Sequence, residues 1–385
     1  MQESRLLDLF CELVRIESPS FHEAPMAARC ADELRRLGFE VSFDDSAERV
    51  GSDTGNLVAR LPGTRTGHVV FSAHMDTVQP CAGIEPVVVD GVVRSAGDTI
   101  LSADDKAGVA AIFEGVRSAV ESGSPRPDVT VLLTTCEEQS LLGAGALAED
   151  ALAWPENLPA ATPEAERDGC FPLFVLDADG APGTIIMGAP YHWTLRARIE
   201  GRAAHAGVEP EEGVSAIQIA AAAVAAMPLG RIDECTTANV GRIEGGVAVN
   251  IVPAVVTLMG ECRSLYEDRV LAQRDAMTRA LEEAAARFGG QVEVAWELDY
   301  PAVMHEPGDA IVAHLEAAAA TCGLESRHAT SGGGADANIL GTKGADAITL
   351  GIGMTNFHSV DEYIEVADLQ NMARYVEAII AEYAM

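Results

Sequence analysis

The chain has 385 residues, of which 48% are apolar, and a formal net charge of −33. This length exceeds that of one ordinary core and predicts two domains, each with enough apolar side chains to bury a core. The negative charge argues against nucleic acid and anionic membranes as partners, because both would repel the chain. No apolar run approaches the roughly 20 residues of a membrane span.

The amino-terminal segment and the cysteines favour a cytoplasmic protein. Residues 1–16 (MQESRLLDLFCELVRI) predict an amphipathic helix and lack the basic start and apolar block of a signal peptide. The eight cysteines contain no CxxC motif. In a large chain without an export signal, such cysteines indicate buried free thiols.

The first two-fifths of the chain alternate predicted helices and strands. The first helix ends at Ser18-Pro19, and Ser20 and Glu23 have the spacing of a capping box for a second helix that stops at Gly38. Four short apolar runs predict buried strands: residues 56–61, 68–73, 129–135 and 171–176. Such runs suit a parallel or mixed sheet that helices cover on both faces. Residues 87–95 (VVVDGVVRS) predict a small hairpin.

After Pro190 the pattern changes to strand, helix, strand, strand, helix, strand, which matches a ferredoxin-like unit. From about residue 303 the alternation of helix and strand resumes. The predicted class is therefore α/β, with a mixed, mostly parallel sheet that has helices on both faces. Residues 1–190 and 303–385 form this larger domain, and residues 191–302 form an inserted ferredoxin-like α+β domain.

Polar residues collect directly after the predicted strands, where open α/β sheets bind ligands. The clusters are His74-Met75-Asp76, Asp104-Asp105-Lys106, Glu137-Glu138, Asp177-Ala178-Asp179 and His358. Each cluster alone has an ordinary explanation as a loop histidine, a helix N-cap, a solvated loop or a turn. Their coincidence indicates a metal site, and this mixture of nitrogen and oxygen donors suits zinc, cobalt or manganese better than an iron–sulfur cluster.

These residues stand in motifs that resemble the M20 family of dinuclear zinc peptidases and, within it, the peptidase T (tripeptidase) branch. The motifs are FSAHMDTV, ILSADDKAGVAAI, TTCEEQSLLGAGAL, FVLDADGAPG, GRAAHAG, VNIVP, ECRS and NFHSVDE. Their order and spacing agree with the family over nearly the whole chain, and the combination is highly specific although no single motif is. The resemblance implies a zinc exopeptidase-like fold for the larger domain and a lid, through which the chain forms a homodimer, for the inserted one.

The resemblance also implies two divalent ions, zinc or else cobalt or manganese. It carries five ligand positions over to this chain: His74, Asp104, Glu138, Asp177 and His358. One histidine holds each ion, Asp104 bridges both, and the remaining two carboxylates complete one site each. Asp179 is the alternative to Asp177, which we prefer because it directly follows the apolar run. Two such ions can polarise a carbonyl and share an activated water.

Two further acidic residues have implied roles beside the ions. Asp76 would orient His74, and Glu137 would be the general base that takes a proton from the water and passes it to the leaving amine. Neighbouring strand residues point in opposite directions, so Glu137 and Glu138 can enter one site from different sides. Strand geometry permits either order of base and ligand, and the order adopted here comes from the resemblance.

The implied substrate contacts lie in the inserted domain and in a later loop. His205 in GRAAHAG resembles a residue that reaches the tetrahedral intermediate, often across a dimer interface. Asn250 and Arg263 resemble positions that contact the substrate backbone or carboxylate, and an arginine can bond both oxygens of a terminal carboxylate. Residues 331–336, which include Gly333, resemble a glycine-rich substrate loop whose backbone approaches the ligand.

The motifs together predict a metal-dependent exopeptidase, an aminopeptidase that removes the N-terminal residue of short peptides, with tripeptides as the expected substrates. A second hypothesis keeps the ions and changes the substrate, to give an M20-type amidase or dipeptidase acting on N-acyl amino acids or dipeptides, because one fold hosts many functions. A third hypothesis is a homologue that binds metal without hydrolysis, and the intact Glu137 argues against it.

Overall fold

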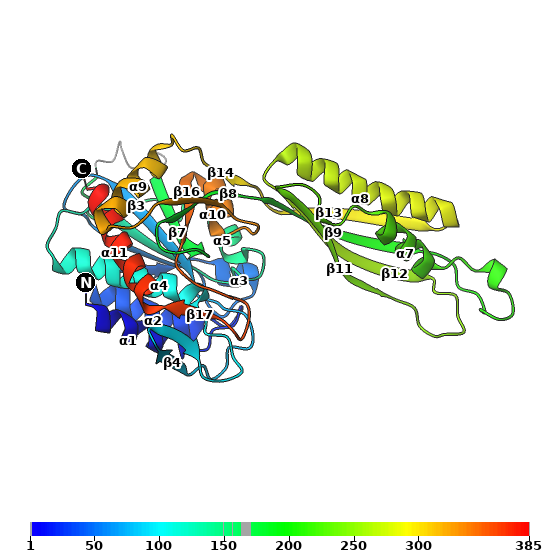
Figure 1. Cartoon of the computed structure of the whole chain (residues 1–385), viewed down its shortest axis with the longest axis horizontal. Coiled ribbons are helices and arrows are strands. Elements are labelled where there is room, and N and C mark those ends of the chain that lie inside the picture. The colour runs from blue at the N-terminus through cyan, green and yellow to red at the C-terminus, as the bar shows by residue number, and fades with distance from the viewer. Residues whose placement is uncertain (1, 149, 156, 163–170, 385) are drawn as a thin grey trace. The chain divides into compact units, whose positions relative to one another are not determined.

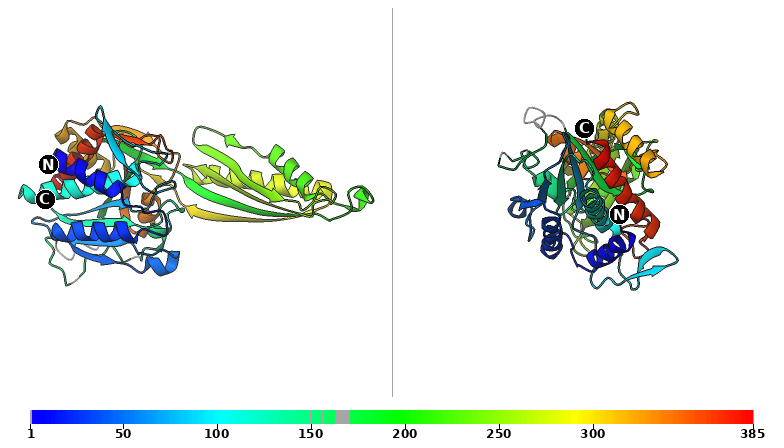
Figure 2. Two further views of the ribbon diagram at one scale, coloured as in Figure 1. Left: turned by 90° about the horizontal axis from the view of Figure 1, so that it is seen from below. Right: turned by 90° about the vertical axis from the view of Figure 1, so that its left-hand side faces the viewer.

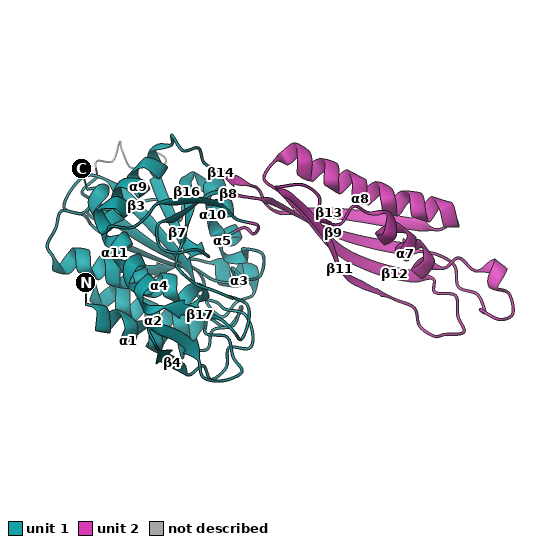
Figure 3. Cartoon of the chain, in the orientation of Figure 1, with its two compact units in different colours: residues 1–187, 305–331, 335–385 teal, residues 188–304, 332–334 magenta. Residues whose placement is uncertain are grey.

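The computed structural model describes residues 2–148, 150–155, 157–162 and 171–384. The chain forms two compact units (Figure 3), the first of residues 1–187, 305–331 and 335–385 and the second of residues 188–304 and 332–334. The sequence pattern predicts domain boundaries after residues 190 and 302, close to those observed. It places residues 332–334 in the larger domain, whereas the structure places them in the second unit. These glycines join the second unit because the Gly334 N–H donates to Tyr300 Oη at 3.1 Å.

A mixed sheet of nine strands forms the centre of the first unit (Figure 1). Its path runs in the order β1-β2-β6-β3-β7-β16-β8-β14, and β15 pairs with β8. The bounds are Glu40–Phe43 (β1), Leu57–Leu61 (β2), His68–His74 (β3), Asp128–Thr134 (β6), Phe171–Ala178 (β7), Thr184–Ala189 (β8), Val303–Met304 (β14), Arg327–Thr330 (β15) and Ala345–Gly351 (β16). Neighbours among β6, β3, β7 and β16 are parallel, and β2 and β8 flank them in antiparallel pairs. The predicted mixed sheet is therefore confirmed.

Alternating side chains of the central strands enter two separate cores. Val69 and Phe71 of β3 lie in the larger core, whereas Val70 lies in the smaller one. The larger core is supplied by α1 (Glu3–Val14), α2 (Ala24–Arg36), α4 (Ala103–Glu121), α9 (Ala310–Cys322) and α11 (Val366–Glu382), and the smaller by α5 (Leu142–Ala146) and α10 (Asp336–Leu340). Helices thus cover both faces of the sheet, as predicted (Figure 2).

Short elements complete the first unit. A three-stranded antiparallel sheet has the order β17-β5-β4, with bounds Pro86–Val89 (β4), Val92–Ser95 (β5) and Tyr363–Glu365 (β17). The predicted hairpin of β4 and β5 turns at Asp90 and Gly91, whose φ angles of 50° and 81° are those that a two-residue turn requires. Two further helical turns are Ser46–Val50 (α3) and Gly341–Lys343 (η2).

The second unit has the predicted ferredoxin-like order of elements. These are β9 (Tyr191–Glu200), η1 (Pro210–Glu212), α7 (Ala216–Ala226), β10 (Gly230–Arg231), β11 (Thr236–Gly245), β12 (Val255–Ser264), α8 (Glu267–Phe288) and β13 (Gln291–Tyr300). The antiparallel sheet has the order β10-β11-β12-β9-β13. Helices α7 and α8 share one core with this sheet, so the fold class is confirmed for both units.

The capping box predicted at Ser20 and Glu23 is wrong. Glu23 is the residue before α2, but its side chain makes no capping hydrogen bond. Ser20 Oγ donates to Asp76 Oδ2 at 2.7 Å, and the buried carboxylate of Glu23 accepts the N–H of Cys136 at 2.8 Å. Contacts with residues far away in the chain take both side chains away from the helix end.

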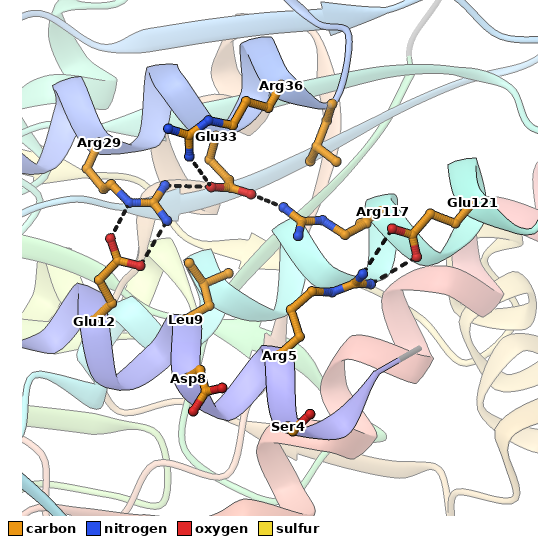
Figure 4. A pocket seen from close by; sticks show the side chains of 11 residues that line it. Ser4, Arg5, Asp8, Leu9, Glu12, Arg29, Glu33, Arg36, Arg117 and Glu121 are labelled. Carbon is orange, nitrogen blue, oxygen red and sulfur yellow. Dashed lines mark hydrogen bonds and ion pairs between the residues drawn. The ribbon is translucent and has the colours of Figure 1, made fainter.

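Charged side chains join three helices of the first unit around a cavity of about 620 Å³ (Figure 4). Glu33 of α2 is buried and accepts Arg29 Nη1 at 2.7 Å, Arg36 Nη1 at 3.4 Å and, from α4, Arg117 Nη2. Arg5 of α1 pairs with carboxylates of α4. The cavity walls therefore hold an ion-pair network in which each of these arginines already has an acidic partner.

The described cysteines agree only in part with the expectation of buried thiols. All seven are free, and Cys30, Cys81, Cys136 and Cys262 are buried. The other three, Cys11, Cys235 and Cys322, are only partly buried, so the prediction is wrong for them, and Cys170 lies outside the described residues. Among the helices that the structure describes, none combines the length and the apolar character needed to cross a membrane.

Candidate active site

The candidate site lies at the carboxyl edge of the parallel strands in the first unit. β3 ends at His74, and Asp177 precedes the last residue of β7. Glu137 follows the end of β6, and His358 lies in the loop between β16 and β17. Because parallel strands bring their carboxyl ends to one edge of a sheet, side chains from four distant segments approach one another here.

His74 is almost completely buried and uses its two ring nitrogens differently. Its Nε2 lies 2.9 Å from Asp104 Oδ1 and 3.7 Å from Asp177 Oδ1. Its Nδ1 lies 2.9 Å from the backbone oxygen of Asp76, which can only accept, so Nδ1 carries the proton. Nε2 is therefore the ring nitrogen that faces the carboxylates, and a histidine held through Nδ1 in this way can offer Nε2 to a metal ion.

His358 faces the other side of Asp104. Its Nε2 lies 2.9 Å from Glu138 Oε1 and 3.1 Å from Asp104 Oδ2. Asp104 thus directs one oxygen towards each histidine, and its peptide bond to Asp105 is cis. A carboxylate between two imidazoles has the arrangement of a ligand that bridges two ions.

Two groups of donor atoms in the described residues are compact enough to hold an ion. One comprises His74, Asp104 and Glu138, and the other His74, Glu137 and Asp177, with donor atoms within 4.8 Å of one another in each. Asp179 and His358 belong to neither group, but His358 lies 2.9 Å from Glu138 Oε1, whereas Asp179, the alternative to Asp177, is exposed. The geometry therefore favours Asp177 as the donor from β7.

The carboxylates of the site need a positive counter-charge. Burial, together with the charge of Asp177, raises the pKa of Glu137 well above its usual value, and burial raises the pKa of Asp177 to about 7. Burial and the charge of Asp104 also raise the pKa of Glu138. Buried like charges of this kind are stabilised by a cation, so the donor set fits divalent ions.

The two histidines of the site can themselves supply part of this positive charge when they are protonated. Hydrogen bonds to Asp104 and Glu138 raise the pKa of His358 to about 10. Burial opposes protonation of His74, but hydrogen bonds to Asp104, Asp177 and Asp76 raise its pKa well above the usual value. Burial also acts against ionisation of Asp104, yet its hydrogen bonds with both histidines lower its pKa.

Buried carboxylates hold the backbone that carries the adjacent glutamates. Asp76 accepts the N–H of Glu137 at 2.9 Å and that of Glu138 at 3.3 Å, and Glu23 accepts the preceding N–H of Cys136. The sequence predicts Asp76 at this site, whereas it predicts for Glu23 only a role in a helix cap. No local pattern connects Glu23 with a strand end more than 100 residues away.

Asp336 is a second acidic residue beside the site, and the sequence pattern includes it in the glycine-rich loop without a role of its own. It ends that loop, begins α10 and is buried. Thr134 Oγ1 donates to its Oδ2 at 2.5 Å, while Oδ1 has no hydrogen-bond partner among the described residues. Burial raises the pKa of Asp336 to about 6. Its charge acts on Glu137, so Asp336 belongs to the electrostatic environment of the site.

His205 and Asn250 lie in the second unit and are brought together by backbone pairing. The Ala206 N–H donates to the Asn250 oxygen at 3.0 Å, and His205 forms an antiparallel bridge with Ile251. Both side chains belong to exposed residues. Backbone pairing thus brings together two segments about 45 positions apart in the sequence, one with His205 and one with Asn250.

Arg263, on β12 of the second unit, already has a carboxylate partner. Its Nε and Nη2 donate to Glu261 Oε2 at 2.8 Å and 2.7 Å. Among the described residues, its Nη1 has two long contacts with neutral oxygens, 3.4 Å to Tyr300 Oη and 3.5 Å to the backbone oxygen of Gly332. Gly333, in the same unit, follows that oxygen directly. One side of the Arg263 fork is therefore firmly bound and the other only weakly.

Comparison with known proteins identifies the family. Residues 70–382 match the model of peptidase family M20/M25/M40. An uncharacterised protein of Bacillus subtilis is 42% identical over 100% of both chains. Carboxypeptidase G2 of a Pseudomonas species is 29% identical and covers 87% of this chain and 78% of its own.

Two solved structures match the whole fold. Aminopeptidase PepT of Bacillus cereus has a TM-score of 0.88 and 39% identity, with 100% of both chains covered. A tripeptidase of Staphylococcus aureus has a TM-score of 0.91 and 36% identity, covering 100% of this chain and 99% of its own. The resemblance inferred from the motifs is confirmed. The chain therefore belongs to peptidase family M20/M25/M40, a family of metal-dependent peptidases.

Proposed function

We propose that the protein is an aminopeptidase that removes the N-terminal residue of short peptides, with tripeptides as its substrates. The observation that carries the hydrolytic chemistry is the position of Asp104, whose two oxygens lie 2.9 Å and 3.1 Å from Nε2 of His74 and His358. The substrate class is supported by the similarity to structures described as an aminopeptidase and a tripeptidase.

The proposed cofactor is a pair of divalent ions, zinc or else cobalt or manganese. His74 and Asp177 would hold one ion, Glu138 and His358 the other, and Asp104 both, because the contacts of Asp104 join the two histidines. When bound, the ions polarise the scissile carbonyl and lower the pKa of the attacking water. Nitrogen and carboxylate donors without thiolates suit this choice of metals.

Glu137 is the proposed general base. Its backbone is fixed by Asp76, and its carboxylate lies within 4.8 Å of the donor atoms of His74 and Asp177. There it takes the proton of the water and returns it to the leaving amine. A pKa raised by burial suits a carboxylate that must give the proton back, since the conjugate base of a very strong acid would not accept it.

The proposed substrate contacts are His205, Asn250, Arg263 and Gly333. His205 and Asn250 are exposed polar residues on two segments that pair through their backbones. Arg263 is the proposed partner of the peptide's terminal carboxylate, because a carboxylate can replace the two long contacts of its Nη1 while Glu261 still holds the other side of the fork.

We further propose that the second unit is a lid that also mediates a homodimer. Residues Ala216–Ala226 of α7 contain no charged side chain, although Ile217 is 46% exposed. An uncharged exposed helix in a chain of net charge −33 is typical of an interface. Sedimentation should then give twice the chain mass of 40.4 kDa. A cytoplasmic location is proposed because the described thiols are free.

A substrate panel on the zinc- or cobalt-loaded protein tests the proposed activity. We expect release of the first residue from tripeptides with a free amine, and no hydrolysis of the same tripeptides after N-acetylation. Hydrolysis of only the blocked compounds would overturn the aminopeptidase proposal. It would favour the amidase alternative. A fully loaded sample without turnover on the whole panel would indicate the non-hydrolytic homologue.

A further inference from the structure

Glu362 is a buried carboxylate that the proposed reaction does not use. It lies four positions after His358 and directly before β17. Its Oε2 accepts the N–H groups of Leu101 and Ser102, both at 2.7 Å, and its Oε1 accepts that of Asp104 at 3.0 Å. One side chain thus binds three backbone donors of a segment about 260 residues away.

The segment before Asp104 is shaped to receive an anion. Ser102 has a φ of 66°, in the left-handed region. A residue of this conformation between extended or helical neighbours turns successive N–H groups towards one point, as in the nests that bind anions. Here the anion is the carboxylate of Glu362, and charge-assisted bonds of this kind are about twice as strong as neutral ones. The backbone position of Asp104 therefore depends on Glu362.

The backbone of Glu362 belongs to the loop that carries His358. Thr355 and Tyr363 exchange both backbone hydrogen bonds, each at 3.0 Å, and so close this loop at its base. Glu362 stands next to that closure. His358 itself has a φ of 60°, so its orientation depends on the exact path of the loop. The carboxylate thereby joins the base of the His358 loop to the backbone of Asp104.

We infer that Glu362 is a positioning residue that fixes Asp104 and His358 relative to each other, and thereby sets the affinity of the ion site that both share with Glu138. This inference rests on the proposed pair of ions. The site of His74 depends on Glu362 less, because Asp76 holds the His74 ring and β7 holds Asp177. Loss of Glu362 is therefore expected to weaken one of two ions more than the other.

The test is calorimetric titration of the metal-free protein with Zn²⁺, with elemental analysis of the bound metal. For the wild type we expect two equivalents. For Glu362→Gln we expect one equivalent to be weakened about 10- to 100-fold, the usual effect of removing a group that orients a ligand, and the other to be weakened less. Glu365→Gln, an exposed glutamate three positions further on, is the matched control and should bind as the wild type does.

The possible results distinguish a failure of the role of Glu362 from a failure of the proposed pair of ions. Two equivalents of unchanged affinity in folded Glu362→Gln would overturn the role of Glu362 and leave the metal centre intact. Fewer than two equivalents in the wild type would overturn the metal centre itself. If Glu362→Gln does not fold, Glu362→Asp keeps the charge but withdraws it by one methylene, and unchanged binding of both ions by that variant would equally contradict the inference.

Discussion

Three successive backbone N–H groups, those of Cys136, Glu137 and Glu138, donate to two buried carboxylates. Glu23 accepts the first and Asp76 the other two. The direction of each glutamate is therefore set through the backbone, which leaves both side-chain carboxylates available for chemistry. This is a structural reason why adjacent glutamates at a strand end can have separate roles.

Glu23→Gln tests this arrangement. A neutral amide replaces a charged acceptor, and a hydrogen bond to a charged group contributes roughly 1.5–3 kcal/mol. We expect kcat to fall about 10-fold or more, with KM and bound metal unchanged, because Glu23 acts on Glu137 only through the backbone. The exposed Glu17→Gln is the control. A folded Glu23→Gln protein with wild-type kcat would show that this hydrogen bond has no catalytic consequence.

His68 gives the fold a pH dependence that is separate from the ion site. Burial lowers its pKa to about 4, and its ring packs against Trp154 and Phe171. In the unfolded chain its pKa is about 6.5, so between pH 6.5 and 4 the unfolded state binds more protons. The stability contributed by neutral His68 is complete above pH 6.5 and is lost as the pH falls towards 4.

Urea unfolding of His68→Gln at several pH values measures this effect. The variant keeps a polar group near Thr130 but cannot titrate. We expect the wild type to lose roughly 2–3 kcal/mol more than His68→Gln between pH 6.5 and 4, because each unit of pKa shift corresponds to about 1.4 kcal/mol. The exposed His22→Gln should follow the wild type. Parallel curves for wild type and His68→Gln would contradict the assignment.

At the level of elements, the strands and their polar ends could be predicted because they depend on local pattern. The runs that contain β3, β6 and β7 are largely buried, and an ionisable residue at or shortly after the end of such a run marks the carboxyl edge. The contacts of Glu23 and Glu362 could not be predicted in this way, since each joins segments more than 100 residues apart. The pairing of Arg263 with Glu261 is not among the contacts expected from the sequence, although residues two positions apart on one strand point to the same face.

The ion-pair network between α1, α2 and α4 makes a prediction about stability (Figure 4). Glu33 is buried under three arginines, so Glu33→Gln leaves them without their shared carboxylate. Removing one partner of a buried pair costs about 3 kcal/mol or more. The midpoint of urea unfolding should fall accordingly. Glu12→Gln, which removes an exposed partner of Arg29, should cost less than about 1 kcal/mol. Equal effects of the two changes would contradict a special role for Glu33.

At the scale of the whole molecule, each unit has its own core. The first unit has a core on either face of its sheet, and the second has one core under α7 and α8. The five proposed ligands and the proposed base all belong to the first unit, whereas His205, Asn250 and Arg263 belong to the second. The proposed hydrolytic groups and the proposed substrate contacts therefore belong to different units of the chain.

The central claim is the division of roles between Glu137 as base and Glu138 as ligand. It is tested most directly by measuring tripeptide turnover and bound metal together in Glu137→Gln and Glu138→Gln. The account predicts that Glu137→Gln lowers kcat about 10²- to 10⁴-fold with the metal content of the wild type. Glu138→Gln should also lose bound metal. Near-normal turnover by Glu137→Gln, or loss of metal from it equal to that of Glu138→Gln, would contradict the account.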